Sequence, residues 1–364
     1  MKTNNMRVSN EWARRPNDQR FTTMADLYAR VASRRSASRV ADVALDTMQL
    51  QLAGDDADSS IMLTDRTGSV QAELNNWTFG QLCSRAKAPA AYLRTLPAAL
   101  AMIPLQYSLE AHEMAEDESN DAKLLVQADG NGDIVSAITS PTYGRIWDAD
   151  VVQSLMANVD LDAWKVPAAS YADRDPKRAT TLYASDRDVF VFLVNESTVD
   201  AAGEVLRRGF YVSNSEVGSA SLEIACFTYD YVCDNRIIWG QSNFKSLNIR
   251  HTSGGPHRFV QKAVPQLAAY VQSSAASMAE AVRTAKAREV GKDRKSVVEW
   301  MRARGFTASV GGKAYDAAEK DPRGYNPRTV WGLVQGVTDV AHDVTHTDAR
   351  VDLETRAGGL LETL

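Results

Sequence analysis

The sequence is poor in cysteine and has no long run of apolar residues. Only Cys83, Cys226 and Cys233 occur among 364 residues, which is too few for a disulfide framework. If Cys226 and Cys233 share a strand, their odd separation places them on opposite faces, so we expect no bridge between them. No window of about 18 residues is continuously apolar, and the first residues lack the apolar core of a signal peptide. We therefore expect a reduced protein of the cytoplasm without a membrane span.

Familiar catalytic and cofactor motifs are also missing. There is no P-loop, no Gly-x-Gly-x-x-Gly after a strand and no Gly-x-Ser-x-Gly elbow. DGNGD (129–133) begins like a calcium loop, but Ile134 and Ser140 stand where that loop needs Gly and Glu. We assign no catalytic residue and no cofactor, and we favour a protein that is not an enzyme. A Cys–His catalytic pair, or an enzyme of unrecognised type, stays open as an alternative.

His342 and His346 are the histidines most suggestive of a metal site. They lie four residues apart on an expected helix, with Asp339 and Asp343 nearby, and this spacing can place two imidazoles on one metal ion. The ligand set is incomplete, however, and no His-Glu-x-x-His pattern is present. We expect no bound metal here.

The order of expected elements predicts the fold class. Helical spacing prevails up to about residue 114, strands and tight turns fill residues 124–240, and Ala-rich helices follow from about residue 260. This order predicts an α+β fold, in which an antiparallel sheet from the central region is flanked by N-terminal and C-terminal helices. We divide the chain into a basic N-terminal arm with a short helix (1–40), an α+β core (41–260) and a mainly helical C-terminal region that packs on the core (261–364).

Two β-hairpins are expected in the central region. LLVQA and IVSAITS flank the turn DGNGD, while RATTLYAS and VFVFLVN flank Asp186 and Arg187. VFVFLVN (189–195) is apolar on both faces, so we expect it to be a central strand.

Three helices have recognisable signals. Met24, Leu27 and Val31 have helical spacing within residues 21–35. Thr78 and Gln81 have capping-box spacing and predict a helix start at Thr78. Asn326 and Pro327 predict the start of a helix that carries the apolar stripe Trp331, Val334, Val337, Thr338 and Ala341.

Charge is strongly segregated along the chain. Residues 235–304 carry thirteen Lys and Arg against four Asp and Glu, although the net charge of the chain is −5. Residues 235–279 contain no acid at all. Cations can track a phosphate backbone, and aromatic rings can stack on unpaired bases. The candidate nucleic-acid-binding residues are Arg236, Trp239, Phe244, Lys245, Arg250, His251, Arg258 and Lys262. Internal pairing of these cations with the acidic half of the chain, or with another subunit, is the alternative.

The stretch Asn214–Gly218 predicts a structural turn between two strands. Asn214, Ser215 and Gly218 are its key residues, because Gly218 can adopt a positive φ and the Asn214 side chain can hold the backbone of the turn. The second strand leads directly into the acid-free block.

Four stretches in this order resemble the phage/plasmid-like protein family, a domain of unknown function found on bacteriophages, plasmids and integrative elements. They are NWTFGQLCSRAKAPAAYLRTLPAAL (76–100), SPTYGRIWDADVVQSL (140–155), FYVSNSEVGSASLEIACFTYDYVCDN (210–235) and NPRTVWGLVQGVTDVAHDV (326–344). The chain departs from the family at Val217, where the family often has Asp. A second departure is YDYV before Cys233, where the family usually has an Arg-Val-type strand.

The resemblance implies a protein of a mobile element in a bacterial host cytoplasm, close to replication or recombination. Together with the basic block, it favours a non-catalytic nucleic-acid-associated protein, such as a single-strand binder or a recombination accessory. Single-stranded DNA is favoured over duplex DNA. The alternative is a host-directed interaction protein, such as an anti-defence factor, and partners then include host proteins. A homo-oligomer also stays open.

Overall fold

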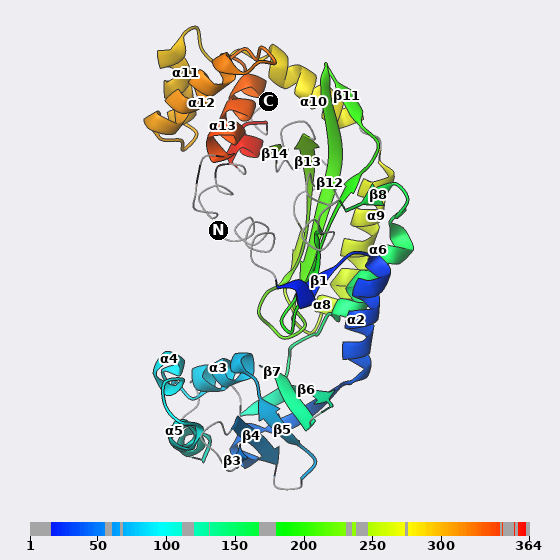
Figure 1. Ribbon diagram of the computed structural model, residues 1–364, viewed down its shortest axis with the longest axis vertical. Helices are drawn as coiled ribbons and strands as arrows, with labels where there is room; N and C mark the ends of the chain where they lie inside the picture. Colours follow the sequence, from blue (N-terminus) through cyan, green and yellow to red (C-terminus); the bar gives the residue numbers. More distant parts are fainter. Residues whose placement is uncertain are drawn as a thin grey trace.

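In the computed structural model, the chain is built around two β-sheets (Figure 1). The structure describes residues 16–54, 60–65, 68–110, 120–130, 132–166, 180–230, 235–237, 247–273, 276–342, 344, 353 and 356–361. The larger sheet occupies the middle of the long axis, the smaller sheet lies at one end, and a group of C-terminal helices lies at the other end (Figure 1). The predicted α+β class is therefore confirmed. The molecule has two sheets, whereas the sequence predicted one.

The larger sheet is antiparallel throughout its described pairings. Its main strands are, in order, β1 (Arg20–Phe21), β9 (Leu182–Ala184), β10 (Val189–Asn195), β12 (Glu204–Asn214), β13 (Leu222–Asp230) and β14 (Asn235–Ile237). Three short strands pair at its sides, namely β8 (Trp164–Lys165) with β10, β11 (Val199–Ala201) with β12, and β15 (Leu247–Ile249) with β13. The β9–β10 hairpin and the central position of β10, which is buried along its length, confirm the sequence prediction.

The smaller sheet comes from the first 139 residues. Its strand order is β2 (Ser38–Ala44), β6 (Asp121–Asp129), β7 (Gly132–Thr139), β5 (Gln71–Leu74), β4 (Ser60–Asp65) and β3 (Met48–Ala53). The β6–β7 hairpin was predicted, and β5 pairs with β7 in parallel. β2 to β5 were not predicted. β3 and β5 alternate between buried and exposed residues, as half-buried strands do, so the expectation of helical spacing up to about residue 114 is wrong for this part of the chain.

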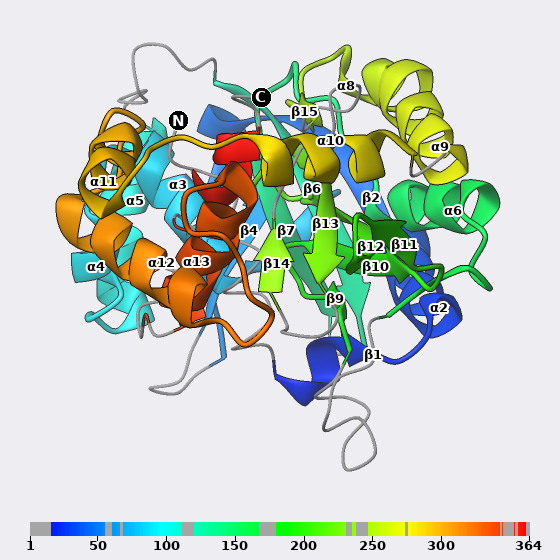
Figure 2. The same cartoon turned by 90° about the horizontal axis from the view of Figure 1, so that it is seen from above.

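Helices cover one face of each sheet. α3 (Asn76–Arg85), α4 (Ala90–Leu93) and α5 (Ala98–Glu110) pack on the smaller sheet through an apolar core that includes Leu82 and Leu105. α2 (Met24–Ser36), α6 (Asp148–Asn158) and a continuous rod formed by α8 (Gly255–Arg258), the π-helical segment η3 (Phe259–Ala263) and α9 (Val264–Gln272) pack on the larger sheet (Figure 2). Two short 3-10 turns also occur, η1 (Asn17–Gln19) before β1 and η2 (Leu45–Thr47) between β2 and β3.

The C-terminal helices form a third core. α10 (Ala276–Ala287), α11 (Arg294–Arg302), α12 (Ala308–Lys320) and α13 (Val330–His342) pack together and against Ala201 and Leu206 of the larger sheet. The stripe predicted on α13 is buried as expected. No helix in the described ranges has the length and apolar character that crossing a membrane requires.

Two predicted helix starts are wrong by a few residues. α3 begins at Asn76, because Asn75 accepts a hydrogen bond from the Thr78 backbone N–H at 2.8 Å, and the Thr78 hydroxyl donates instead to the Val135 carbonyl at 2.9 Å. α13 begins at Val330, and Thr329 Oγ1 accepts from the Gly332 N–H at 3.1 Å. By contrast, α2 carries Met24, Leu27 and Val31 on its buried face as predicted.

Candidate functional site

The described part of the acid-free block is a surface segment next to the larger sheet. Arg250 follows β15, Arg258 ends α8 and Lys262 lies in η3. The side chains of Arg250 and Lys262 are exposed and that of Arg258 is half-buried. The Arg258 guanidinium donates to the Arg250 carbonyl at 3.2 Å and to Thr252 Oγ1 at 2.7 Å. The two arginines are therefore neighbours, one at the start of the loop after β15 and the other at the end of α8.

These three cations have no acidic partner in the ranges that the structure describes. Residues 247–273 contain no Asp or Glu, and no salt bridge to Arg250, Arg258 or Lys262 is present among described residues. The sequence left two explanations of the block open, internal pairing and a ligand surface. For these three residues, internal pairing with a described acid is not observed.

The other candidate residues have different positions. Trp239, Phe244 and Lys245 lie outside the described residues. The backbone of Arg236 lies in β14, where it is paired with Tyr229.

His251 is buried and does not lie on this surface. Its Nδ1 accepts from the Ile146 N–H at 3.3 Å, and its ring stacks on Tyr143 with centroids 5.1 Å apart. Burial lowers the pKa of His251 to about 4, so the imidazole is neutral at pH 7. His251 therefore connects the block to the interior and contributes no positive charge.

Gly144 joins the same loop to the rest of the chain through close backbone contact. Its N–H donates to the His251 carbonyl at 3.0 Å, and Tyr143 forms an isolated bridge with Thr252. A Cβ at Gly144 would lie 2.0 Å from the Thr252 carbonyl oxygen, so only glycine fits here.

The Asn214–Gly218 turn has the predicted position between β12 and β13. Gly218 has a φ of 84°, as expected for a turn glycine. The side chain that holds the turn is Ser215, whose Oγ accepts from the Ser219 N–H at 3.0 Å. The Asn214 amide has another role, because it donates to the Ile146 carbonyl at 2.8 Å and to Asp148 Oδ1 at 2.7 Å.

Val217, at the tip of this turn, joins the two sheets. Its side chain packs with Leu125 and Ala137 of the smaller sheet and with the rings of Trp77 and Trp147. Its carbonyl accepts from Trp77 Nε1 at 3.1 Å and from Gln81 Nε2 at 3.2 Å. Three of the four stretches that carry the family resemblance therefore meet at this junction.

A buried ion cluster lies directly behind the turn. Arg34 Nε lies 2.9 Å from Glu216 Oε1, and Arg34 also forms a salt bridge with Asp148. Glu216 Oε2 accepts from the Asp148 backbone N–H at 3.0 Å. The side chains of Arg34, Asp148 and Glu216 are 10%, 0% and 1% exposed, so the cluster is shielded from water. Arg145 adds a hydrogen bond to the Glu216 carbonyl.

Burial sets the protonation of this cluster. Burial, followed by repulsion from Glu216, raises the pKa of Asp148 well above its ordinary value. Burial alone would lower the pKa of Arg34, but the attraction of Glu216 and Asp148 outweighs it and the net pKa is raised. Burial lowers the pKa of Arg145.

Sequence reasoning missed Arg34, Asp148 and Glu216 as a group. They lie 114 and 68 residues apart along the chain, so no local spacing links them. The available signal was indirect, because Asp148 and Glu216 fall within two of the resemblance stretches.

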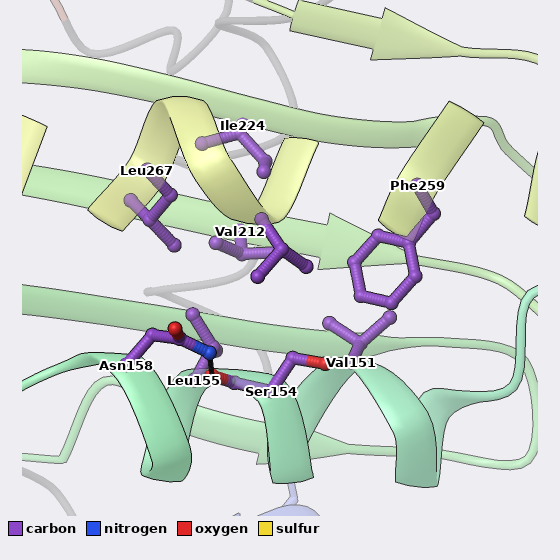
Figure 3. Close-up of a pocket in the computed structure, with 9 residues that line it drawn as sticks. Val151, Ser154, Leu155, Asn158, Val212, Ile224, Phe259 and Leu267 are labelled. Atoms are coloured by element: carbon purple, nitrogen blue, oxygen red, sulfur yellow. Dashed lines mark hydrogen bonds between the residues drawn. The ribbon is translucent and has the colours of Figure 1, made fainter. Parts of the chain in front are cut away.

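An apolar cavity lies between α6 and the rod of α8, η3 and α9, close to this junction (Figure 3). It is lined by Val151, Ser154, Leu155, Asn158, Val212, Ile224, Phe259, Val264 and Leu267. Asn158 Nδ2 donates to the Ser154 carbonyl at 2.8 Å. The cavity volume is about 10 Å³, roughly what one water molecule needs. It is too small for a substrate or cofactor.

The described ranges contain no assembled metal site and no disulfide. No group of three or more His, Cys, Asp and Glu side chains is arranged there to hold a metal ion. The side chain of His342 and all of His346 lie outside the described residues, so the expectation for that pair stays a prediction. Cys83 and Cys226 are free and buried, and Cys233 lies outside the described residues.

Comparison with known proteins gives one result. The sequence model of the family described as Domain of unknown function (DUF932) matches residues 172–359, more than half of the chain. This match includes the Asn214–Gly218 turn, the acid-free block and the C-terminal helices. No curated protein and no solved structure matches the sequence significantly.

Proposed function

The chain belongs to the Domain of unknown function (DUF932) family, and we propose that it is a non-catalytic protein that binds nucleic acid, with single-stranded DNA preferred. The binding surface is the acid-free segment that contains Arg250, Arg258 and Lys262. The wider role, as an accessory of replication or recombination in a mobile element within a bacterial cytoplasm, follows from the family resemblance and is part of the same proposal.

One observation carries this proposal. Within a segment without acids, Arg250 and Lys262 are exposed and Arg258 is half-buried beside Arg250, and none of the three is neutralised by a salt bridge to a described residue. A cation that is paired with an internal acid exerts little net positive potential on a ligand. A surface cation without such a partner can contact a phosphate and release the counterion bound there. The binding of bases by Trp239 and Phe244 remains an expectation from the sequence.

Fluorescence-polarisation titrations with single-stranded and duplex oligonucleotides test the proposal. If Arg236, Lys245, Arg250, Arg258 and Lys262 each neutralise one phosphate, the slope of log K against log[salt] on single strands is about −3.5, at roughly −0.7 per contact. Single-stranded DNA should bind more tightly than duplex DNA through this surface. Absence of binding to either form at low salt would contradict the proposal.

A second candidate function, a host-directed protein-interaction factor, is favoured by one surface feature. Leu100, Ile103 and Tyr107 lie on one side of α5 with exposures of 53%, 60% and 61%, and Tyr92 of α4 is 60% exposed nearby. A group of exposed large apolar residues is typical of a protein contact surface. Sedimentation velocity over a range of concentrations tests whether the contact is self-association. Ile103→Asp should then lower the sedimentation coefficient, and an unchanged coefficient would exclude a dimer formed through α5.

A further inference from the structure

The helices α11 and α12 are joined by a tight, well-defined turn. α11 ends in a Schellman motif, in which the Phe306 N–H donates to the Met301 carbonyl at 3.2 Å and the Gly305 N–H donates to the Arg302 carbonyl at 3.1 Å. Gly305 has a φ of 89°, which reverses the chain. Thr307 then caps α12, because its Oγ1 accepts from the Val310 N–H at 3.2 Å. A short turn that contains a glycine joins the two helices of a helix-turn-helix, as it also does in an αα-hairpin.

Packing fixes the two helices against each other. Gly311 of α12 lies against α11, since a Cβ added there would be 3.5 Å from Met301 Cβ and 3.7 Å from the Cα of Val298. Arg294, at the start of α11, reaches α12 and donates two hydrogen bonds of 2.8 Å to the Asp316 carboxylate. The pair also packs on α13 through the C-terminal core. The unit therefore presents its outer face as one rigid surface.

That outer face carries positive charge. The exposed cations without a salt bridge to a described residue are Lys292, Lys295 and Arg302 on or before α11, and Lys313 and Lys320 on α12. Three exposed acids accompany them. Asp293 caps α11, Glu299 lies on α11 and Glu319 lies near the end of α12. A shallow hollow runs beside the start of α12 and is lined by Arg294, Lys295, Val298, Glu299, Arg302 and Ala308.

The first turn of α12 has small, exposed side chains. Ala308 and Ser309 lie at the surface, so no bulky side chain keeps the helix backbone away from a partner. The major groove of B-form DNA admits one α-helix, whereas the deep, narrow major groove of A-form RNA does not. A cationic helix pair in which the start of α12 has only small side chains therefore fits duplex DNA.

We propose that α11 and α12 form a helix-turn-helix unit that binds duplex DNA, with the N-terminal half of α12 in the major groove. Lys295, Arg302 and Lys313 then contact backbone phosphates on either side, and Ser309 lies nearest the base edges. This inference rests on the proposed function, nucleic-acid binding. It assigns a different surface, at the opposite end of the molecule from the smaller sheet (Figure 1), and a different form of DNA.

The test is a set of titrations of the full-length protein with one mixed-sequence duplex at several salt concentrations. The triple variant Lys295→Ala, Arg302→Ala, Lys313→Ala should flatten the slope of log K against log[salt] by about 2.7, at roughly 0.9 per contact on duplex DNA. Between 50 and 200 mM salt, the wild-type protein should then lose about 40-fold more affinity than the variant. Arg30→Ala, an exposed cation of α2, is the matched control and should leave the slope unchanged.

A second variant tests α12 itself. Ser309→Glu adds a negative charge at an exposed position and removes no cation or core contact, so it should weaken duplex binding while circular dichroism stays unchanged. A wild-type slope in the triple variant, duplex affinity unaffected by Ser309→Glu, or no duplex binding by the wild-type protein would overturn the inference.

Titrations with single-stranded DNA separate this inference from the proposed function. If replacing Arg250 and Lys262 weakens binding to single strands, while the α11 and α12 variants bind duplex DNA like the wild-type protein, the inference fails and the proposed function stands. If duplex binding depends on α11 and α12 but no single strand binds, the preference for single strands and its surface fail, and the helix-turn-helix stands.

Discussion

The carbonyl of Val217, at the tip of a turn in the larger sheet, accepts a hydrogen bond of 3.1 Å from the indole Nε1 of Trp77 in the smaller half of the molecule. The Val217 side chain is 1% exposed and packs between Leu125 and Ala137. One residue thus supplies both a polar and an apolar contact between the two sheets. It is also a position at which the chain departs from the family it resembles.

We expect Val217→Ala to lower the free energy of unfolding by about 2 kcal/mol, because a buried valine loses most of its apolar contact area. Val217→Asp should cost more, since it places a carboxylate in an apolar pocket. Urea unfolding followed by tryptophan fluorescence measures both effects. Val205→Ala, at a position that is 49% exposed, is the control and should change stability by less than about 0.5 kcal/mol. Equal effects at Val217 and Val205 would show that the turn does not join the sheets.

His251 should make the protein less stable in mild acid. Its pKa in the folded state is about 4, against about 6.5 in the unfolded chain. The unfolded chain therefore binds a proton first as the pH falls, so this stability is present above pH 6.5 and is lost towards pH 4. We expect a loss of about 3 kcal/mol relative to His251→Asn, which keeps an acceptor for the Ile146 N–H but does not titrate. Parallel stability–pH curves for the two proteins would contradict the assigned burial.

Asp148 should have the opposite dependence. Because burial raises its pKa, the folded state holds a proton at pH values where the unfolded chain has already lost it. Its contribution to stability is therefore present below about pH 3.9 and is lost as the pH rises through the folded-state pKa. Relative to the wild-type protein, Asp148→Asn should gain stability as the pH rises from about 4 through the folded-state pKa of Asp148, measured by urea unfolding. A relative loss over this range would mean that the attraction of Arg34 outweighs burial.

Gly144→Ala should disturb the loop that joins Arg250 to α8, the helix that ends at Arg258. The added Cβ would lie 2.0 Å from the Thr252 carbonyl oxygen, and both atoms belong to backbone that cannot move independently. We expect a loss of more than about 2 kcal/mol, measured as a fall in melting temperature. The control is Gly130→Ala, where an added Cβ meets nothing within 4 Å, and it should melt like the wild-type protein.

Local patterns in the sequence predicted the elements that depend on local forces. The β6–β7 and β9–β10 hairpins follow from alternating residues around tight turns, and α2 follows from the spacing of its three buried residues. Helix starts were less predictable where two capping residues compete. At α3 the tertiary bond from Thr78 to the Val135 carbonyl decides in favour of Asn75 as the cap, and no local pattern contains that bond.

The junction could not be predicted for the same reason. Arg34 finds its partners through the packing of α2 on the larger sheet, and neither carboxylate is distinguishable from a solvated acid by its neighbours in the sequence. The acid-free block was visible, because charge segregation is a property of the sequence itself. Its members were not equivalent, however, since His251 is buried and Arg250 is exposed.

The salt dependence of binding to single-stranded DNA, compared between the wild-type protein and Arg250→Ala, Lys262→Ala, tests the central claim most directly. Both side chains are exposed and form no salt bridge with a described residue, so the double variant should fold normally. Two lost phosphate contacts should flatten the slope of log K against log[salt] by about 1.4, at roughly 0.7 per contact. Arg30→Ala should leave it unchanged. An identical slope in the wild-type protein and the double variant would contradict the assignment of this segment as the nucleic-acid-binding surface.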